Sequence, residues 1–191
     1  MGRWETDARG RMTRAALDLF AERGYDQTTA YDIANRAGVT ERTFFRHFLD
    51  KREVLFDGAG ALAEIAAEAI EEAPAELSPF SAALVGITAA GRALDERRDH
   101  AVRRNAVIAA NAGLQERELL KLAAMSERTA SALRTRGVPE PTATLAAQAA
   151  TTVFHVAFAH WVAMAEPVAL PDVVAETATT LRALHVDAGG L

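Results

Sequence analysis

The sequence contains no cysteine, so it can form neither disulfide bonds nor thiolate metal sites. It also has no uninterrupted apolar run of roughly 18 residues, the length that a membrane-spanning helix needs. The opening stretch, MGRWETDARGRM, lacks the apolar core that secretory signals have. We therefore expect a cytoplasmic protein with no membrane contact.

Signatures of catalysis and of metal binding are missing as well. The motifs H-E-x-x-H and G-x-S-x-G, a phosphate-binding loop and a cysteine nucleophile are all absent. His155 and His160 are five residues apart, which places them on different faces of a helix and argues against a shared metal ion. The sequence thus predicts a protein that is not an enzyme and that holds no metal and no cofactor.

Alanine, by contrast, is abundant, and apolar residues recur at helical spacing while β-branched runs are rare. These features predict an all-α fold of about nine helices. Gly24 is placed to end the first helix in the left-handed conformation. The expected helices cover residues 7–23, 30–37, 41–48, 50–72, 79–94, 97–110, 114–136, 141–164 and 171–185.

The second and third of these helices form a helix-turn-helix. Thr29 is expected to cap the second helix, with Asp32 three positions on as its capping-box partner. Gly38 ends that helix, and Thr40 can cap the next one. Since only Val39 stands between this glycine and this threonine, the turn is short.

The third helix lies in the stretch GVTERTFFRHF and has two different faces. Phe44 and Phe48, with Val39, are expected to point inward onto Phe20 and Ile33. The outward set is Arg42, Phe45 and Arg46. An arginine can bond O6 and N7 of a guanine together, and an apolar ring can contact a thymine methyl, so this face suits a DNA major groove. The alternative is that the two arginines form a solvated face and Phe45 packs under the N-terminal segment.

Positive charge is concentrated near this helix, although the whole chain carries a net charge of −5. Residues 1–52 hold ten Lys and Arg against eight Asp and Glu, whereas the remainder holds eleven against eighteen. A basic head on an acidic body indicates contact with nucleic acid at one end. His47 and Lys51 at the edge of the third helix, and the hydroxyls of Thr29 and Thr40, suit phosphate oxygens.

The segment LFAERGYDQTTAYDIANRAGVTERTFFRHFLDKREVLF, residues 19–56, closely resembles the N-terminal domain of TetR-family transcriptional repressors. The preceding RWETDARGRMTRAALD resembles the arm and first helix of actinobacterial members. The remaining two-thirds of the chain resembles the family only in length and helical character. The matching positions are Phe20, Gly24, Thr28, Thr29, Ile33, Ala34, Ala37, Gly38, Thr43, Phe48 and Lys51.

The resemblance implies a homodimer with one helix-turn-helix per subunit, bound to a double-stranded DNA operator. It also implies a role in DNA binding for Thr43. Because the family more often has Tyr at the position of Phe45, an apolar contact with a thymine is expected there. Arg3 and Trp4 form either a minor-groove arm or a disordered tail. Base or groove contacts are implied for Thr40, Arg42, Phe45 and Arg46, and backbone contacts for Thr29, His47 and Lys51.

For the body, the resemblance implies dimerisation through the last two helices and a pocket for an unknown small-molecule inducer. The eighth helix carries a stripe that either forms a dimer seam or packs onto the fourth and seventh helices within one subunit. This stripe includes Thr151, Phe154, Phe158 and Trp161. The candidates for the pocket are Arg104, Asn105, Ile108 and His155.

We therefore expect a helix-turn-helix DNA-binding domain over residues 1–52 and a larger helical ligand-binding and dimerisation domain over 53–191. The expected function is a ligand-responsive transcriptional repressor that binds a palindromic operator as a homodimer. The fourth helix joins the two domains and would carry the ligand-induced change. The alternative is a helical ligand- or protein-interaction protein without sequence-specific DNA binding.

Overall fold

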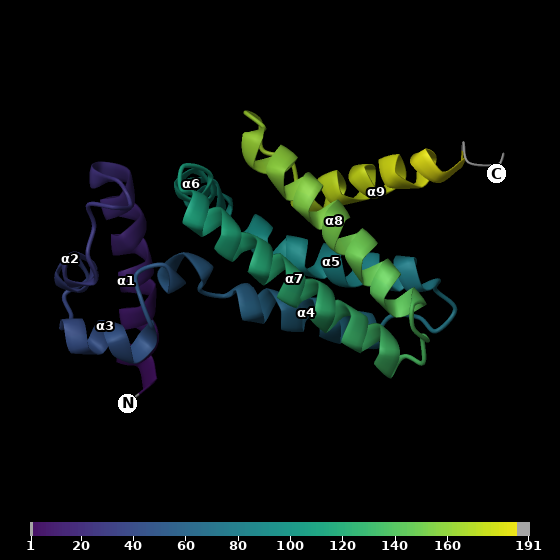
Figure 1. Ribbon diagram of the computed structural model, residues 1–191, viewed down its shortest axis with the longest axis horizontal. Helices are drawn as coiled ribbons and strands as arrows, with labels where there is room; N and C mark the ends of the chain where they lie inside the picture. Colours follow the sequence, from purple (N-terminus) through teal and green to yellow (C-terminus); the bar gives the residue numbers. More distant parts are fainter. Residues whose placement is uncertain (1, 187–191) are drawn as a thin grey trace. The chain divides into compact units, whose positions relative to one another are not determined.

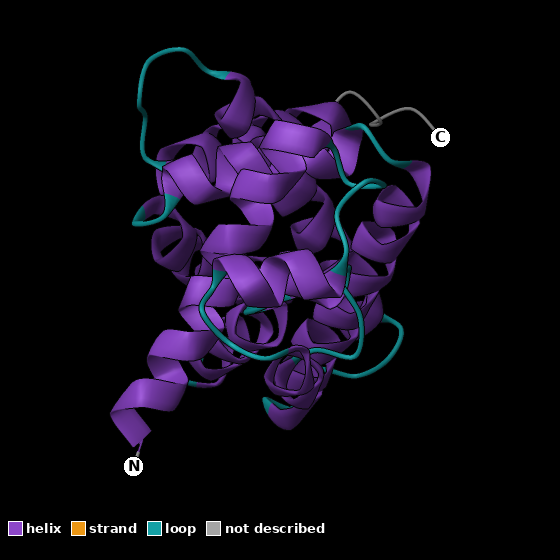
Figure 2. Ribbon diagram, turned by 90° about the vertical axis from the view of Figure 1, so that its left-hand side faces the viewer, coloured by secondary structure: helices purple, strands orange, loops and turns teal. Residues whose placement is uncertain are grey.

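A computed structural model describes residues 2–186 of the chain, with side chains from residue 8 to residue 184. Over these residues the fold is all-α, as predicted, and contains no strand (Figure 2). None of the described helices is long and apolar enough to cross a membrane. The side chains of Arg3 and Trp4 lie outside the described residues. The elements, shown in Figure 1, are α1 Gly2–Arg23, α2 Ala30–Arg36, α3 Glu41–His47, the 3-10 helix η1 Glu53–Phe56, α4 Ala59–Glu71, α5 Pro79–Asp95, α6 Arg98–Ala109, α7 Ala112–Thr135, α8 Thr142–Ala163 and α9 Leu170–Val186.

The prediction of one long fourth helix is wrong. Asp50 does accept backbone hydrogen bonds, from the N–H of Arg52 at 2.7 Å and that of Glu53 at 3.2 Å, as an N-cap should. The segment that follows is the short η1, and α4 begins only after Gly58. Gly58 has a φ of +88°, a left-handed conformation that interrupts an α-helix and that glycine adopts at little cost.

The described residues form two compact units. One, here called the head, consists of the chain up to Gly58 together with Val102–Glu118. The other, the body, consists of Ala59–Ala101 and the chain from Leu119 onward. Helices α6 and α7 therefore each contribute residues to both units. The expected division after residue 52 did not include this second segment of the head.

In the head, α1 packs against α2 and η1, and α2 packs against α3. The inward orientation predicted for α3 is confirmed, because Phe44 and Phe48 are buried and their ring centroids are 5.4 Å apart. The left-handed turn predicted at Gly24 is also confirmed by its φ of +83°. The largest members of the head core are Met12, Leu17, Leu19, Phe20, Ile33, Phe44, Phe48, Leu55, Phe56, Ile108 and Leu114.

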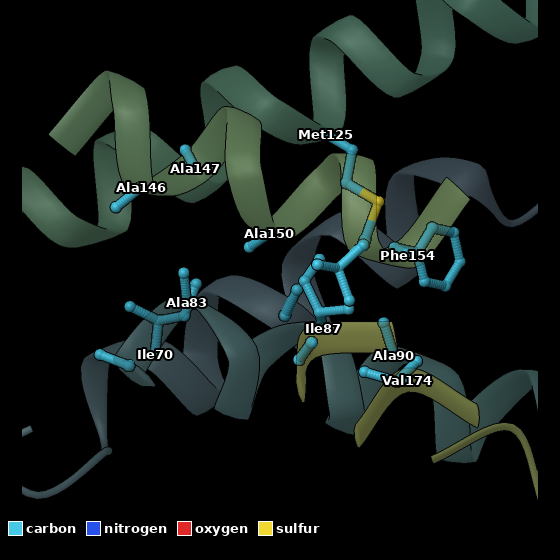
Figure 3. Close-up of a cluster of buried hydrophobic side chains, with 14 of the residues drawn as sticks. Ile70, Ala83, Ile87, Ala90, Met125, Ala146, Ala147, Ala150, Phe154 and Val174 are labelled. Carbon is cyan, nitrogen blue, oxygen red and sulfur yellow. The ribbon is translucent and has the colours of Figure 1, made fainter. Parts of the chain in front are cut away.

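In the body, α4 packs against α5, while α8 packs against α5 and α9. Small residues dominate these contacts: alanines of α5 face alanines of α8, and Met125 of α7 reaches between them toward Ile87 (Figure 3). Helices α4 and α5 approach each other closely at Gly86 of α5. A Cβ atom there would lie 2.6 Å from Cγ1 of Ile70 and nearer still to the carbonyl oxygen of Ala66, so α4 and α5 pack this closely only with glycine at this position.

We expect Gly86→Ala to destabilise the protein by about 1–3 kcal/mol, because an atom forced into a filled contact costs more than the helix propensity that alanine gains. Gly91→Ala is the matched control on the same helix. Its Cβ would lie 3.5 Å from Cγ of Leu170, an ordinary van der Waals contact. This control should be neutral or stabilise the fold by up to about 1 kcal/mol. Urea denaturation followed by circular dichroism measures both changes, and equal effects of the two substitutions would contradict the close packing of α4 on α5.

Candidate nucleic-acid interface

Both threonine caps predicted for the helix-turn-helix are present. The hydroxyl of Thr29 accepts from the N–H of Asp32 at 3.1 Å, and the N–H of Thr29 donates to the Asp32 carboxylate at 2.9 Å, which completes a capping box. Hydrogen bonds from the side chain and backbone of Thr29 lower the pKa of the Asp32 carboxyl. At the start of α3, the hydroxyl of Thr40 accepts from the N–H of Thr43 at 3.2 Å. The turn between the helices is thus fixed at both ends.

Helix α3 presents its predicted outward residues to solvent. Arg42 and Arg46 are exposed, and the side chain of Phe45 is 50% exposed. Phe45 packs edge-on against the buried Phe44, with ring centroids 5.4 Å apart and an interplanar angle of 89°. An aromatic ring that is half-exposed and supported from beneath favours the outward alternative over packing under the N-terminal segment. The face combines two cations with an apolar surface.

Two further exposed hydrophobic side chains of the head were not singled out from the sequence. Tyr31, in the first turn of α2, and Leu49, just after α3, are both exposed. Helical periodicity could have identified Tyr31, because Ile33 and Ala34 mark the buried side of α2 and residue 31 does not share it. Leu49 lies beyond the end of α3, where helical periodicity gives no guidance.

The structure gives Lys51 a different role from the predicted phosphate contact. Its ammonium donates to the carbonyl oxygens of Tyr25 and Thr28, both at 2.8 Å, and to that of Asp26 at 3.4 Å. It also lies 4.3 Å from the centre of the Tyr25 ring. Since an ammonium has three N–H donors, this set of carbonyls uses all of them. Lys51 therefore holds the loop between α1 and α2 in place.

His47 is half-buried rather than displayed at the edge of α3. Its Nε2 atom is buried and has no hydrogen-bond partner among the described residues. Its ring centroid lies 6.5 Å from that of Phe48. Of the two edge residues, neither presents a fully exposed cationic group.

We expect Lys51→Met to destabilise the head by about 2 kcal/mol, because the substitution keeps the apolar stem and leaves three carbonyls without their charged donor. Arg42→Met is the control, since it removes an exposed cation from α3 and should leave stability unchanged within about 0.5 kcal/mol. Amide hydrogen exchange over residues 24–29 measures directly how much the loop between α1 and α2 is destabilised. Unchanged exchange in Lys51→Met would contradict the structural role of this lysine.

The residues predicted for a dimer seam are instead part of the body core. Thr151, Phe154 and Trp161 are buried, and Phe158 is half-buried against them. The indole N–H of Trp161 donates to the carbonyl oxygen of Val168 at 2.8 Å, and the guanidinium of Arg98 lies 5.5 Å from the centre of the indole ring. The stripe thus packs within the subunit, where α8 packs against α5 and α9 and shares its buried cluster with residues of α4 and α7.

The residues predicted for the ligand pocket fall into two groups. Arg104, Asn105 and Ile108 belong to the head, where Ile108 is buried in the core and Arg104 forms an ion pair with Glu118. His155 belongs to the body and lines a cavity of about 430 Å³, here called the α7–α8 cleft. No group of three or more potential metal ligands occurs among the described side chains. The cleft is lined by, among others, Leu119, Leu122 and Ser126 of α7 and Gln148, Thr151 and His155 of α8.

Comparison with known proteins identifies the N-terminal part of the chain. Residues 13–57 match the family described as bacterial regulatory proteins, tetR family. Residues 13–57 form a domain of this family. The match covers the second half of α1 together with α2, α3 and η1, which is the part of the head that carries the exposed basic and aromatic face.

Individual proteins match over different parts of the chain. The HTH-type transcriptional regulator TcmR of Streptomyces glaucescens is 42% identical over 74 residues, which are 39% of this chain and 33% of TcmR. The match thus spans about one third of that relative. Two solved structures match over nearly the whole chain at low identity, so they show the fold alone. They are FadR of Thermus thermophilus in complex with lauroyl-CoA (22% identity, 91% of this chain and 92% of FadR, TM-score 0.58) and NalD of Pseudomonas aeruginosa (17%, 93% and 96%, 0.63).

Proposed function

We propose that this TetR-family protein is a ligand-responsive transcriptional repressor that binds a palindromic operator as a homodimer. One observation carries the DNA-binding part of the proposal: α3 exposes two arginines on either side of a supported aromatic ring. Arg42 and Arg46 are suited to guanine O6 and N7, and Phe45 to a thymine methyl. The exposed hydroxyls and backbone N–H groups at the starts of α2 and α3, at Thr29 and Thr40, are suited to phosphate oxygens.

A palindromic operator requires two copies of α3 about one DNA turn apart, roughly 34–36 Å. The side of α8 that faces away from the body core is suited to bring two copies together. Its Leu145 is 62% exposed and its Val156 is 53% exposed. Small residues surround them, and the spacing of four and three residues repeats along the helix. The proposed seam, here called the α8 outer face, consists of Leu145, Ala149, Thr152, Val156, Ala159 and Ala163.

The ligand response is assigned to the body. The α7–α8 cleft offers apolar walls with several polar groups, a combination typical of small-molecule sites. FadR of Thermus thermophilus, which shares this fold, binds lauroyl-CoA. A ligand that favours a different spacing of the two α3 helices would weaken DNA binding by population shift, with a coupling of about 1–3 kcal/mol.

The alternative is a helical ligand- or protein-interaction protein that does not read DNA sequence. Under this alternative, the exposed basic and aromatic face of α3 has no role in binding nucleic acid. Selection of bound sequences from a random duplex library separates the two functions. Enrichment of a palindrome that binds more weakly as salt rises supports a dimeric operator reader. A folded dimer that enriches no sequence supports the alternative.

On the selected operator, we expect Arg42→Ala to cost about 1–3 kcal/mol of binding free energy and to relax specificity at one base pair per half-site, because one bidentate base contact is lost. Arg92→Ala, which removes an exposed arginine from α5 in the body, is the control and should leave affinity unchanged. Binding titrations with operators changed at single base pairs measure both effects. A uniform loss over all operator sequences would instead assign Arg42 to a phosphate.

For the dimer, we expect Val156→Glu to raise the dissociation constant by about 100-fold or more. The substitution buries two carboxylates without partners in the seam, one from each subunit. Val85→Glu makes the same change at an exposed valine of α5 and should leave the association state unchanged. Sedimentation velocity over a range of concentrations measures both. Dissociation caused by Val85→Glu but not by Val156→Glu would place the seam elsewhere.

A further inference from the structure

The segment Val102–Glu118 is built into the head although it is far from the helix-turn-helix in sequence. Ile108 of α6 and Leu114 of α7 are both buried in the head core. That core also contains Phe44 and Phe48, whose burial orients α3. The position of this segment therefore affects the same packed cluster that supports the DNA-facing helix.

Arg104 makes the most extensive polar contacts of this segment. Its Nε atom donates to the carbonyl oxygen of Leu55 in η1, and its two terminal nitrogens donate to the Glu118 carboxylate at 3.1 and 2.6 Å. Its guanidinium also lies 5.0 Å from the centre of the Phe56 ring. Both side chains are mostly shielded from solvent, at 15% exposed for Arg104 and 25% for Glu118. Such a paired, forked contact is geometrically specific, so a movement of Glu118 must alter the contact that Arg104 makes with η1.

Two further ion pairs connect the segment to the rest of the head. Arg103 of α6 pairs with Asp18 of α1, and Arg117 of α7 pairs with Glu53 of η1. Two consecutive residues of α7, 117 and 118, thus act on η1, one directly and one through Arg104. These contacts connect the first turns of α7 to the 3-10 helix.

The same helix forms one wall of the α7–α8 cleft. Leu119 directly follows Glu118, and Leu122 and Ser126 continue the wall one and two turns further along. Across the cleft, Thr151 is only 7% exposed, and its hydroxyl has no hydrogen-bond partner among the described residues. A ligand that moves α7 and α8 apart would uncover that hydroxyl and offer it a hydrogen-bond partner.

We propose that Arg104 and Glu118 are positioning residues that couple occupancy of the α7–α8 cleft to the head. The proposal rests on the proposed ligand-responsive function and specifies its route. A ligand that separates α7 from α8 displaces the first turns of α7 and with them Glu118. Arg104 then no longer holds both the Glu118 carboxylate and the Leu55 carbonyl, so η1 and the core beneath α3 loosen. The coupling thus runs along α7, whereas the expected path through a continuous fourth helix is interrupted at Gly58.

The absence of native cysteine allows a direct test on the full chain. Ala123 lines the cleft and is exposed, so Ala123→Cys labelled with N-phenylmaleimide places a ring in the cleft. Ala124→Cys with the same label is the control, because residue 124 is exposed on the same helix and is not among the residues that line the cleft. Amide hydrogen exchange over η1 and α3 is the readout. We expect the label at 123 to speed exchange there by about 5-fold or more, the lower end of typical allosteric coupling, and the label at 124 to change it less than about 2-fold.

Glu118→Gln in the Ala123→Cys background tests the pair itself. It should reduce the effect of the label to less than about 2-fold, because a neutral amide no longer holds Arg104 by charge. Glu116→Gln, an exposed position of the same helix, should keep the full effect. Arg104→Lys is a second variant, which keeps the positive charge but cannot contact both oxygens of the Glu118 carboxylate at once. It replaces Glu118→Gln in the experiment if circular dichroism shows that Glu118→Gln does not fold. The proposal is overturned if the label keeps its full effect in folded Glu118→Gln or folded Arg104→Lys. It is also overturned if the label has no effect on exchange in the protein that carries Ala123→Cys alone.

Operator affinity of the same proteins is measured separately. If the label at 123 changes hydrogen exchange in the head but no protein binds DNA, the coupling holds and the proposed DNA-binding function fails. If the proteins bind the operator and the label changes neither exchange nor affinity, the coupling fails and the DNA-binding function holds. In the expected case, the label at 123 weakens operator binding by about 5-fold or more, and Glu118→Gln removes most of that difference.

Discussion

The burial of Phe44 and Phe48 is the constraint on which the candidate interface depends. These two rings are one helical turn apart and fill the space beneath α3, so the helix can face only one way. Phe45 then has to project outward, and its contact with the edge of Phe44 restricts its orientation. An aromatic residue in the middle of a basic face is thus held in position by the core of the head. The pre-ordered ring lowers the entropy that binding must overcome.

The body relies on a different principle. Alanine and glycine allow α4, α5, α8 and α9 to approach closely, and few large side chains fill the remaining space. Contacts of this kind are short and numerous, so the helices tolerate little change in their separation. Between α7 and α8, polar and apolar groups line a cleft. Under the proposed coupling, α7 is the element that responds to a molecule bound there.

Much of the fold could be predicted from sequence because its signals are local. Caps at Thr29 and Thr40, and glycine at residue 24, fix helix ends through hydrogen bonds within a few residues. The failures concern contacts between distant segments. Lys51 could not be recognised as structural, because its three carbonyl partners lie 23 to 26 residues away. Likewise, the apolar stripe of α8 read equally well as a seam or as core, since periodicity shows that a face is covered but not what covers it.

Two separate segments of the chain form the head, and this has a consequence for recombination between relatives. A single crossover near Gly58 would give a chimaera the helix-turn-helix without Ile108 and Leu114, and it would place another protein's side chains opposite Leu55 and Glu53. Exchange of DNA specificity between relatives therefore requires either two crossovers or a compatible segment at 102–118. Substitutions on the outward side of α3 avoid this difficulty, because they leave both parts of the head unchanged. We therefore expect point changes on the outward side of α3 to disturb the head less than an exchange of domains at a single crossover.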